Sequence, residues 1–109
     1  MSVERILSRT AFSIAATGTT FDTNLIISRG KRATRYILEL PNYTTGTPTT
    51  TLSIIDANSV TIFTGSAHAE NANYSIPIDL ELVGLYILRL TLSGEAGGIT
   101  TAYLTILGF

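Results

Sequence analysis

Residues 74–107 constrain the fold more than any other stretch of the chain. We expect a short strand at Tyr74–Ile78 and, after a corner that contains Gly84, a long apolar strand at Leu85–Leu92. A Gly-rich turn then returns the chain into a last strand at Ile99–Leu107. Apolar runs bounded by glycine turns are typical of antiparallel strands. The stretch therefore predicts the closing ribbon of an antiparallel β-sandwich.

The rest of the chain continues this pattern of short strands and turns. Further strands are expected at residues 11–15, 23–28, 33–40, 52–54 and 60–62. No helix of ordinary length fits. Turn signals recur about every 8–12 residues, which predicts an all-β domain, a single antiparallel β-sandwich of about 7–8 strands, Ig-like or a small jelly roll. We assign residues 23–109 to this domain and residues 1–22 to an N-terminal arm or first strand.

Three segments carry local expectations of their own. Arg29-Gly30-Lys31 is interpreted as a hairpin turn, because glycine adopts a positive φ without strain. Asp56-Ala57-Asn58 is expected to turn the chain between two β-branched runs. Near the N-terminus Ser2 could cap a short helix through Ile6 and Leu7, or the segment could lead into a strand; both alternatives stay open.

Composition excludes several classes of function. Charged residues make up 14% of the chain, against about 25% in a typical globular protein, and threonine takes their place. The net charge of −1 gives no general attraction to nucleic acid or to anionic membranes. The absence of cysteine excludes disulfides, thiolate nucleophiles and Cys-type metal sites. No apolar run resembles a secretory signal or a membrane span, so we expect synthesis in the cytoplasm.

The charges are distributed unevenly along the chain. Six of the seven basic residues precede residue 36, and six of the eight acidic residues follow it. Either the two sets neutralise each other within one domain, or they support head-to-tail contact between copies. The densest basic segment, residues 29–35, is interpreted as edge protection or as contact with an acidic partner. Nucleic-acid binding would require more positive charge with aromatic residues interleaved.

A corner motif resembles the immunoglobulin-like and fibronectin-type sandwiches. In Leu82-Val83-Gly84-Leu85-Tyr86-Ile87-Leu88, a small residue makes a turn and a tyrosine follows two positions later. The resemblance implies that the Tyr86 hydroxyl bonds back across the corner. Leu88 stands where the family has its second cysteine. The core tryptophan of the family is absent, so Leu52 or Ile54 is expected to fill its volume.

A charge-poor, cysteine-free sandwich without a signal peptide also resembles accessory proteins of bacteriophage virions. These include head decoration or cement proteins and Ig-like modules of capsids and tails. The resemblance implies a non-enzymatic structural protein that is made in the host cytoplasm and located in the virion. It also implies two partners, namely further copies of the chain in a homo-oligomer and a major capsid or other virion protein. No cofactor, nucleic acid or membrane partner is expected.

Candidate catalytic and metal-binding groups have simpler explanations. His68 and Ser66 lie two residues apart on a loop, which does not provide a triad geometry, so we expect an exposed histidine. Asp79 and Glu81 are interpreted as a solvated corner. The Asp56 turn lacks the glycine and the distal glutamate of an EF-hand. We therefore predict no catalytic residue and no metal site.

Both ends of the chain carry apolar residues suited to partner contact. The chain ends at Phe109 with no polar tail after the last strand, and Val3, Ile6 and Leu7 are apolar near the N-terminus. Exposed apolar groups of this kind favour docking or oligomerisation. The predicted partner contacts are Val3, Ile6, Leu7, Arg29, Lys31, Arg32 and Phe109.

Two other functional classes remain as alternatives to a virion subunit. The first is a cell-surface adhesion or carbohydrate-binding module, with Tyr43, Phe63 and Tyr74 as stacking candidates. The second is a small hydrolase that uses Ser66 and His68.

Overall fold

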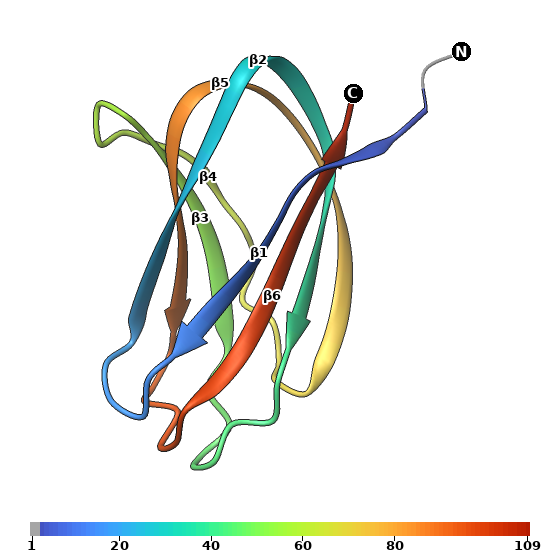
Figure 1. Cartoon of the computed structure of the whole chain (residues 1–109). Helices are drawn as coiled ribbons and strands as arrows, with labels where there is room; N and C mark the ends of the chain where they lie inside the picture. Colours follow the sequence, from blue (N-terminus) through green and yellow to red (C-terminus); the bar gives the residue numbers. More distant parts are fainter. Residues whose placement is uncertain (1–2) are drawn as a thin grey trace.

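The computed structural model describes residues 3–109, and this part of the chain forms six strands and no helix (Figure 1). Two of the strands are 21 residues long, and the other four are between 4 and 10 residues. The strands are β1 (Arg5–Ile14), β2 (Thr20–Leu40), β3 (Thr50–Asp56), β4 (Thr61–Thr64), β5 (Ala72–Leu92) and β6 (Thr100–Gly108).

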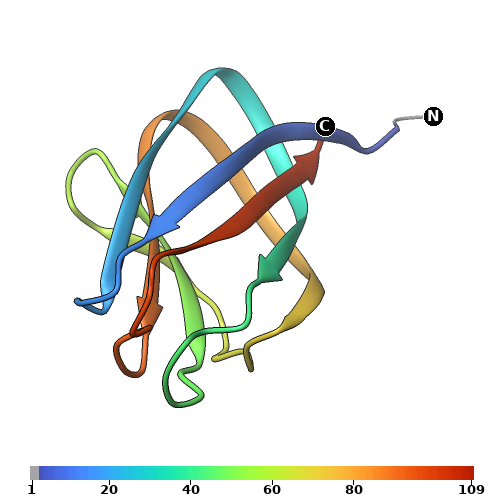
Figure 2. The ribbon, with the colours of Figure 1, turned by 60° about the horizontal axis from the view of Figure 1, so that its bottom comes forward.

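All strand pairs are antiparallel, in the order β1-β6-β2-β5-β3-β4. The long strands β2 and β5 pair from Thr20–Thr91 to Leu40–Ala72 and arch together over one end of the molecule (Figures 1 and 2). The second half of β2 also pairs with β6, whereas its first half pairs, within the described residues, with β5 alone. The two bent strands therefore contribute one segment to each of two layers.

The two layers contain four strand segments each. One layer contains β1, β6, the second half of β2 and the first half of β5. The other contains the first half of β2, the second half of β5, β3 and β4. The predicted all-β antiparallel sandwich is confirmed, and its eight segments follow the order of a jelly roll. The Ig-like order is wrong, because β1 pairs with the last strand instead of the second.

The expected hairpin at Arg29-Gly30-Lys31 is also wrong. Strand β2 runs through these residues without interruption, because both of its halves find their partner in β5. Between the pairs Ile27–Gly84 and Lys31–Leu82, three residues of β2 oppose one of β5. Extra residues on one strand of a pair bend it, so this irregularity makes a corner between the layers.

The opposite side of this corner contains the motif that resembled the immunoglobulin-like family. Gly84 has a φ of 98°, a conformation that a side chain would strain. The Tyr86 hydroxyl accepts a hydrogen bond from the Val83 amide and donates one to the Val83 carbonyl, each at 2.9 Å. The hydrogen bond that the resemblance implied is therefore present, on a jelly-roll corner.

Strand β1 corrects the expectation for the N-terminal segment. The helix through Ile6 and Leu7 is wrong, because this region pairs with β6 from Arg5 onward. Pairing satisfies the backbone groups of a segment too short for a stable isolated helix. The proposed cap at Ser2 lies outside the described residues. Leu7 is the extra residue of a bulge between the pairs Ile6–Leu107 and Ser8–Ile106.

The core lies between the two layers and follows the predicted alternation. Tyr36, Leu38 and Leu40 of β2 are buried, while the residues between them are more exposed. Leu52 and Ile54 are both fully buried, as expected for residues that replace a core tryptophan. The β3–β4 hairpin turns at Asp56-Ala57-Asn58, as predicted.

Candidate partner-binding cleft

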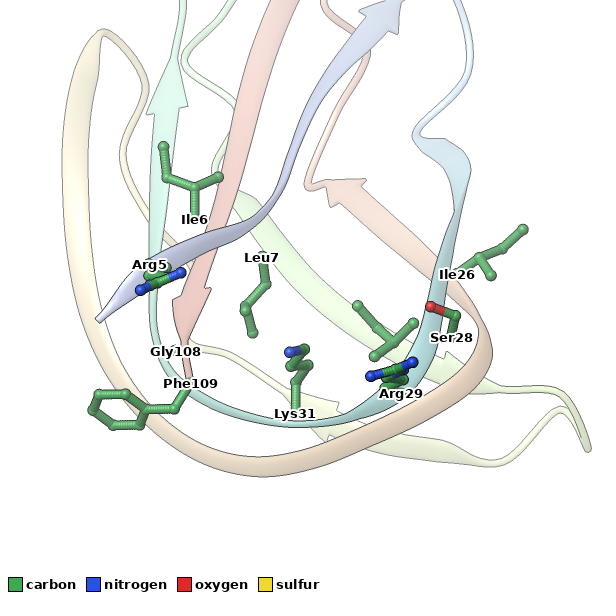
Figure 3. A pocket seen from close by; sticks show the side chains of 10 residues that line it. Arg5, Ile6, Leu7, Ile26, Ser28, Arg29, Lys31, Gly108 and Phe109 are labelled. Atoms are coloured by element: carbon green, nitrogen blue, oxygen red, sulfur yellow. The ribbon is translucent and has the colours of Figure 1, made fainter. Parts of the chain in front are cut away.

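A cleft of about 280 Å³ opens at the arched end of the molecule, between the start of β1 and the bend of β2 (Figure 3). The chain termini contribute to it as well, because β1 begins and β6 ends at this place. The residues that line it are Arg5, Ile6 and Leu7 of β1, Ile26, Ile27, Ser28, Arg29 and Lys31 of β2, Gly108 of β6 and Phe109.

Five of the seven predicted contact residues line this one cleft: Ile6, Leu7, Arg29, Lys31 and Phe109. Val3 is 66% exposed and precedes β1 by two residues. Arg32 is engaged elsewhere, because its guanidinium lies 3.0 Å from Asp79 and 3.8 Å from Glu81. The fold thus gathers most of a set that is spread over the whole sequence, although whether these residues contact a partner stays a prediction.

The cleft also contains residues that sequence reasoning did not select. Arg5, Ile26 and Ile27 belong to this group, together with Ser28 and Gly108. Ile26 lies between two inward-facing residues of β2, so strict alternation assigns it to the outer surface. The sequence therefore contained a signal that Ile26 is exposed. It contained no signal that Arg5 lies near β2, because this proximity depends on the pairing of β1 with β6.

Apolar side chains form much of the surface at this end. Ile27 is buried, and the half-buried Leu7 points from the bulge of β1 into the cleft (Figure 3). Around these two residues Ile6 is 63%, Ile26 72% and Phe109 45% exposed. Apolar groups this exposed at the rim of a cleft are typical of a binding surface.

Unneutralised positive charge is the second property of the cleft. Arg9, Arg32, Arg35 and Arg89 all form ion pairs, so the interpretation that the domain neutralises itself holds for them. Within residues 3–109, Arg5, Arg29 and Lys31 have no acidic group at ion-pair distance. All three line the cleft. The positive charge left over by the fold is concentrated at one end.

The end of β6 closes one side of the cleft through a close backbone contact. The Phe109 amide donates to the Arg32 carbonyl, and the Arg32 amide donates to the Phe109 carbonyl, both at 3.0 Å. A Cβ at Gly108 would lie 1.9 Å from the Arg32 oxygen. Only glycine therefore lets the two strands approach this closely, while the Phe109 ring points away from the cleft (Figure 3).

Glu4 fixes the segment that leads into β1. Its carboxylate accepts a 2.6 Å hydrogen bond from the Thr34 hydroxyl and forms an ion pair with Arg35. The Thr34 hydroxyl, aided by Arg35, holds the pKa of Glu4 below its ordinary value despite an opposing effect of burial. Because Thr34 and Arg35 belong to β2, this contact spans β6 and keeps Arg5 and Ile6 at the cleft.

The histidine lies at the opposite end of the fold and is not the exposed residue that we expected. His68 is only 9% exposed, because its backbone bonds to Thr50 and its ring stacks on Tyr74 at a centroid distance of 4.4 Å. Its Nε2 lies 3.3 Å from the buried Tyr36 hydroxyl. No hydrogen bond to Ser66 occurs in the described part of the chain, so the nucleophile–base pair of a hydrolase is not assembled.

The aromatic candidates for carbohydrate stacking are engaged within the protein. Tyr43 is 3% exposed, and its hydroxyl lies 2.9 Å from the Thr50 hydroxyl. Phe63 packs edge-on against Tyr36, and Tyr74 has one ring face on His68. Tyr43 is therefore wrong as an exposed platform, because its ring belongs to the core.

The acidic turn at Asp56 serves a structural purpose. Its carboxylate accepts hydrogen bonds from the amides of Asn58 and Val60, both at 2.9 Å. From residue 3 to residue 109 there is no group of three or more potential metal ligands. The same range holds no helix long and apolar enough to cross a membrane.

Comparison with known proteins identifies the fold. No protein-family model and no curated protein sequence matches the chain. A family 35 carbohydrate-binding module from Clostridium thermocellum is 13% identical, with a TM-score of 0.51 over 96% of this chain and 98% of that one. This likeness shows that the chain shares its β-sandwich architecture.

Two further solved structures resemble the chain less closely. The carbohydrate-binding module CBM36, in complex with calcium and xylotriose, is 12% identical with a TM-score of 0.44 and 99% coverage of both chains. The infectious bursal disease virus Gx strain contains a chain that is 12% identical with a TM-score of 0.42; 97% of this chain matches 32% of that one.

Proposed function

We propose that this chain is a non-enzymatic virion subunit, a capsid decoration or cement protein or another head or tail accessory protein. One observation carries the proposal: the fold concentrates exposed apolar residues, and cations without an ion pair among residues 3–109, in a single cleft at the ends of β1 and β6. A surface of this composition suits binding to another protein. In this proposal the chain is made in the host cytoplasm and its place of action is the virion.

An apolar patch that adjoins the cleft through Ile26 supports a binding role with repeated weak contacts. Ile26 and Leu85 are 72% and 47% exposed and lie directly opposite each other on β2 and β5. Val83, also exposed, is two residues from Leu85 along β5. This apolar patch of Ile26, Val83 and Leu85 provides a contact for a second copy. A repeating lattice would add such modest contacts into stable attachment.

The test is association with particles. The tagged chain is mixed with purified virions from the same source, and the mixture is separated by gradient sedimentation. We expect the chain to co-migrate with the particles, to saturate at a fixed number of copies per particle, and to be detected by mass spectrometry in untreated virions. A particle preparation that neither contains nor binds the chain would refute the proposal.

A glycan screen separates this proposal from the carbohydrate-binding alternative. We expect no glycan to bind the purified chain, because Tyr43 is buried in the core, Phe63 packs against Tyr36, and His68 covers one face of Tyr74. Specific glycan binding that a Tyr74→Ala substitution abolishes would favour the alternative.

A further inference from the structure

Two irregular strand segments, one in β1 and one in β2, form the walls of the cleft. Successive side chains of a strand point to opposite sides of the sheet. The cleft nevertheless contacts four consecutive residues of β2, Ile26 to Arg29, and three consecutive residues of β1, Arg5 to Leu7. The alternation is interrupted at both places, because Leu7 is the extra residue of a bulge and residues 28–30 of β2 oppose one residue of β5.

Both of these segments have an edge that lacks a partner strand within residues 3–109. Strand β1 is the first in the order and pairs with β6 alone. The half of β2 that contains Ile26 pairs with β5 on one side, and β6 joins β2 only from Ala33 onward. The outward N–H and C=O groups of an unpaired edge are a template for a further extended segment.

From these two observations we infer that the cleft is an acceptor site for an extended, acidic segment of a partner protein, which binds by adding a strand to the edge of β2. This inference rests on the proposed function and specifies the chemistry of the partner. The incoming segment would pair along the regular part of β2 that ends at Ile27, next to the bend at residues 28–30 that carries Arg29.

Charge complementarity identifies the segment as acidic. Arg5, Arg29 and Lys31 surround the cleft without acidic partners in the described chain. Carboxylates of an added strand would form ion pairs with these three cations. An alternating segment would place carboxylates toward these cations and apolar side chains toward Leu7 and Ile27. Main-chain hydrogen bonds then give affinity, and the alternate side chains give specificity.

The same charges explain why edge protection and partner binding are compatible. Lysine and arginine at an edge discourage addition of a strand that is itself basic or neutral. The corresponding edge of a second copy carries the same cations and is repelled. An acidic segment is attracted instead, so the cations make the edge selective for an acidic partner.

A peptide-binding experiment tests the inference on the full chain. The probe is a fluorescent synthetic peptide of alternating glutamate and valine, and the readout is fluorescence anisotropy. Two control peptides have either lysine in place of glutamate or N-methylated amides, which cannot donate main-chain hydrogen bonds. We expect binding of the first peptide only, with an affinity that falls as salt is raised.

Matched variants locate the binding site. The double substitution Arg29→Gln with Lys31→Gln should weaken binding of the acidic peptide about tenfold. Arg9→Gln with Arg89→Gln removes the same charge from ion pairs outside the cleft and should leave binding unchanged. Equal loss in both variants, equal binding of the N-methylated peptide, or no binding of the acidic peptide would overturn the inference.

Two further outcomes separate this inference from the proposed function. If particles bind the wild type and the Arg29→Gln, Lys31→Gln variant equally, the inference fails and the virion proposal stands. If the peptide binds as expected but no particle does, the virion proposal fails alone. Self-association that the double substitution weakens would identify a second copy as the occupant and would also overturn the inference.

Discussion

Replacing Gly108 with alanine should open the end of β6 and with it one wall of the cleft. The new Cβ would lie 1.9 Å from the Arg32 carbonyl oxygen, whereas a carbon–oxygen contact needs about 3.3 Å. The two backbones must therefore separate by about 1.4 Å. That movement breaks both 3.0 Å hydrogen bonds between Phe109 and Arg32, each of which contributes about 1 kcal/mol.

We expect Gly108→Ala to lower the free energy of unfolding by about 2 kcal/mol and the melting temperature by about 8 °C. Urea titration followed by circular dichroism measures both the loss and its m value. Gly94→Ala is the matched control, because a Cβ at Gly94 meets no atom within 4 Å. That substitution should be neutral or stabilising by about 0.5 kcal/mol through the unfolded state. Equal stability of the two variants would refute the argument from close approach.

Two further substitutions test the corner and the acid response. Tyr86→Phe removes the hydroxyl that bonds both backbone groups of Val83 and should lower stability by about 1–2 kcal/mol in urea titration, while Tyr103→Phe, at an exposed ring, should have no effect. Hydrogen bonds from Arg89 hold the pKa of Asp22 below its ordinary 3.8, so this carboxylate stabilises the fold above that pH and loses its contribution as the pH falls further. The urea midpoint of Asp22→Asn should therefore depend less on pH below about pH 4 than that of the wild type, and identical profiles would contradict the pairing.

Much of the fold could be predicted because strand periodicity and turn chemistry are local. The alternation around Tyr36 and the turn at Asp56 are each determined by a short segment of sequence, and both are found where expected. The conformation of residues 28–31, in contrast, depends on partners that are distant in the sequence. A glycine between cations is compatible with a hairpin and with a bend, and only the presence of β5 along both halves of β2 decides between them.

The sequence selected five of the residues that line the cleft, but it did not predict that they come together in one place. Exposed apolar and basic residues at the termini and at residues 29–31 could be selected by composition alone. Their convergence depends on pairs such as Arg5–Gly108, which are separated by almost the whole chain. The expectation that His68 is exposed is wrong for the same reason. Its burial comes from contacts with Thr50 and Tyr74, which its own polar loop does not reveal.

The shared strands β2 and β5 have a consequence for how the molecule assembles and comes apart. Each runs through both layers, so neither layer has a hydrogen-bonded framework that can persist without the other. Partners such as Leu25 and Tyr86 are far apart in sequence. Pairing them closes a long loop, and the conformational entropy of that loop is lost before the stabilising contacts form. The domain is therefore expected to fold slowly and to unfold in one cooperative step, with the terminal strands β1 and β6 joining a ribbon that already spans both layers.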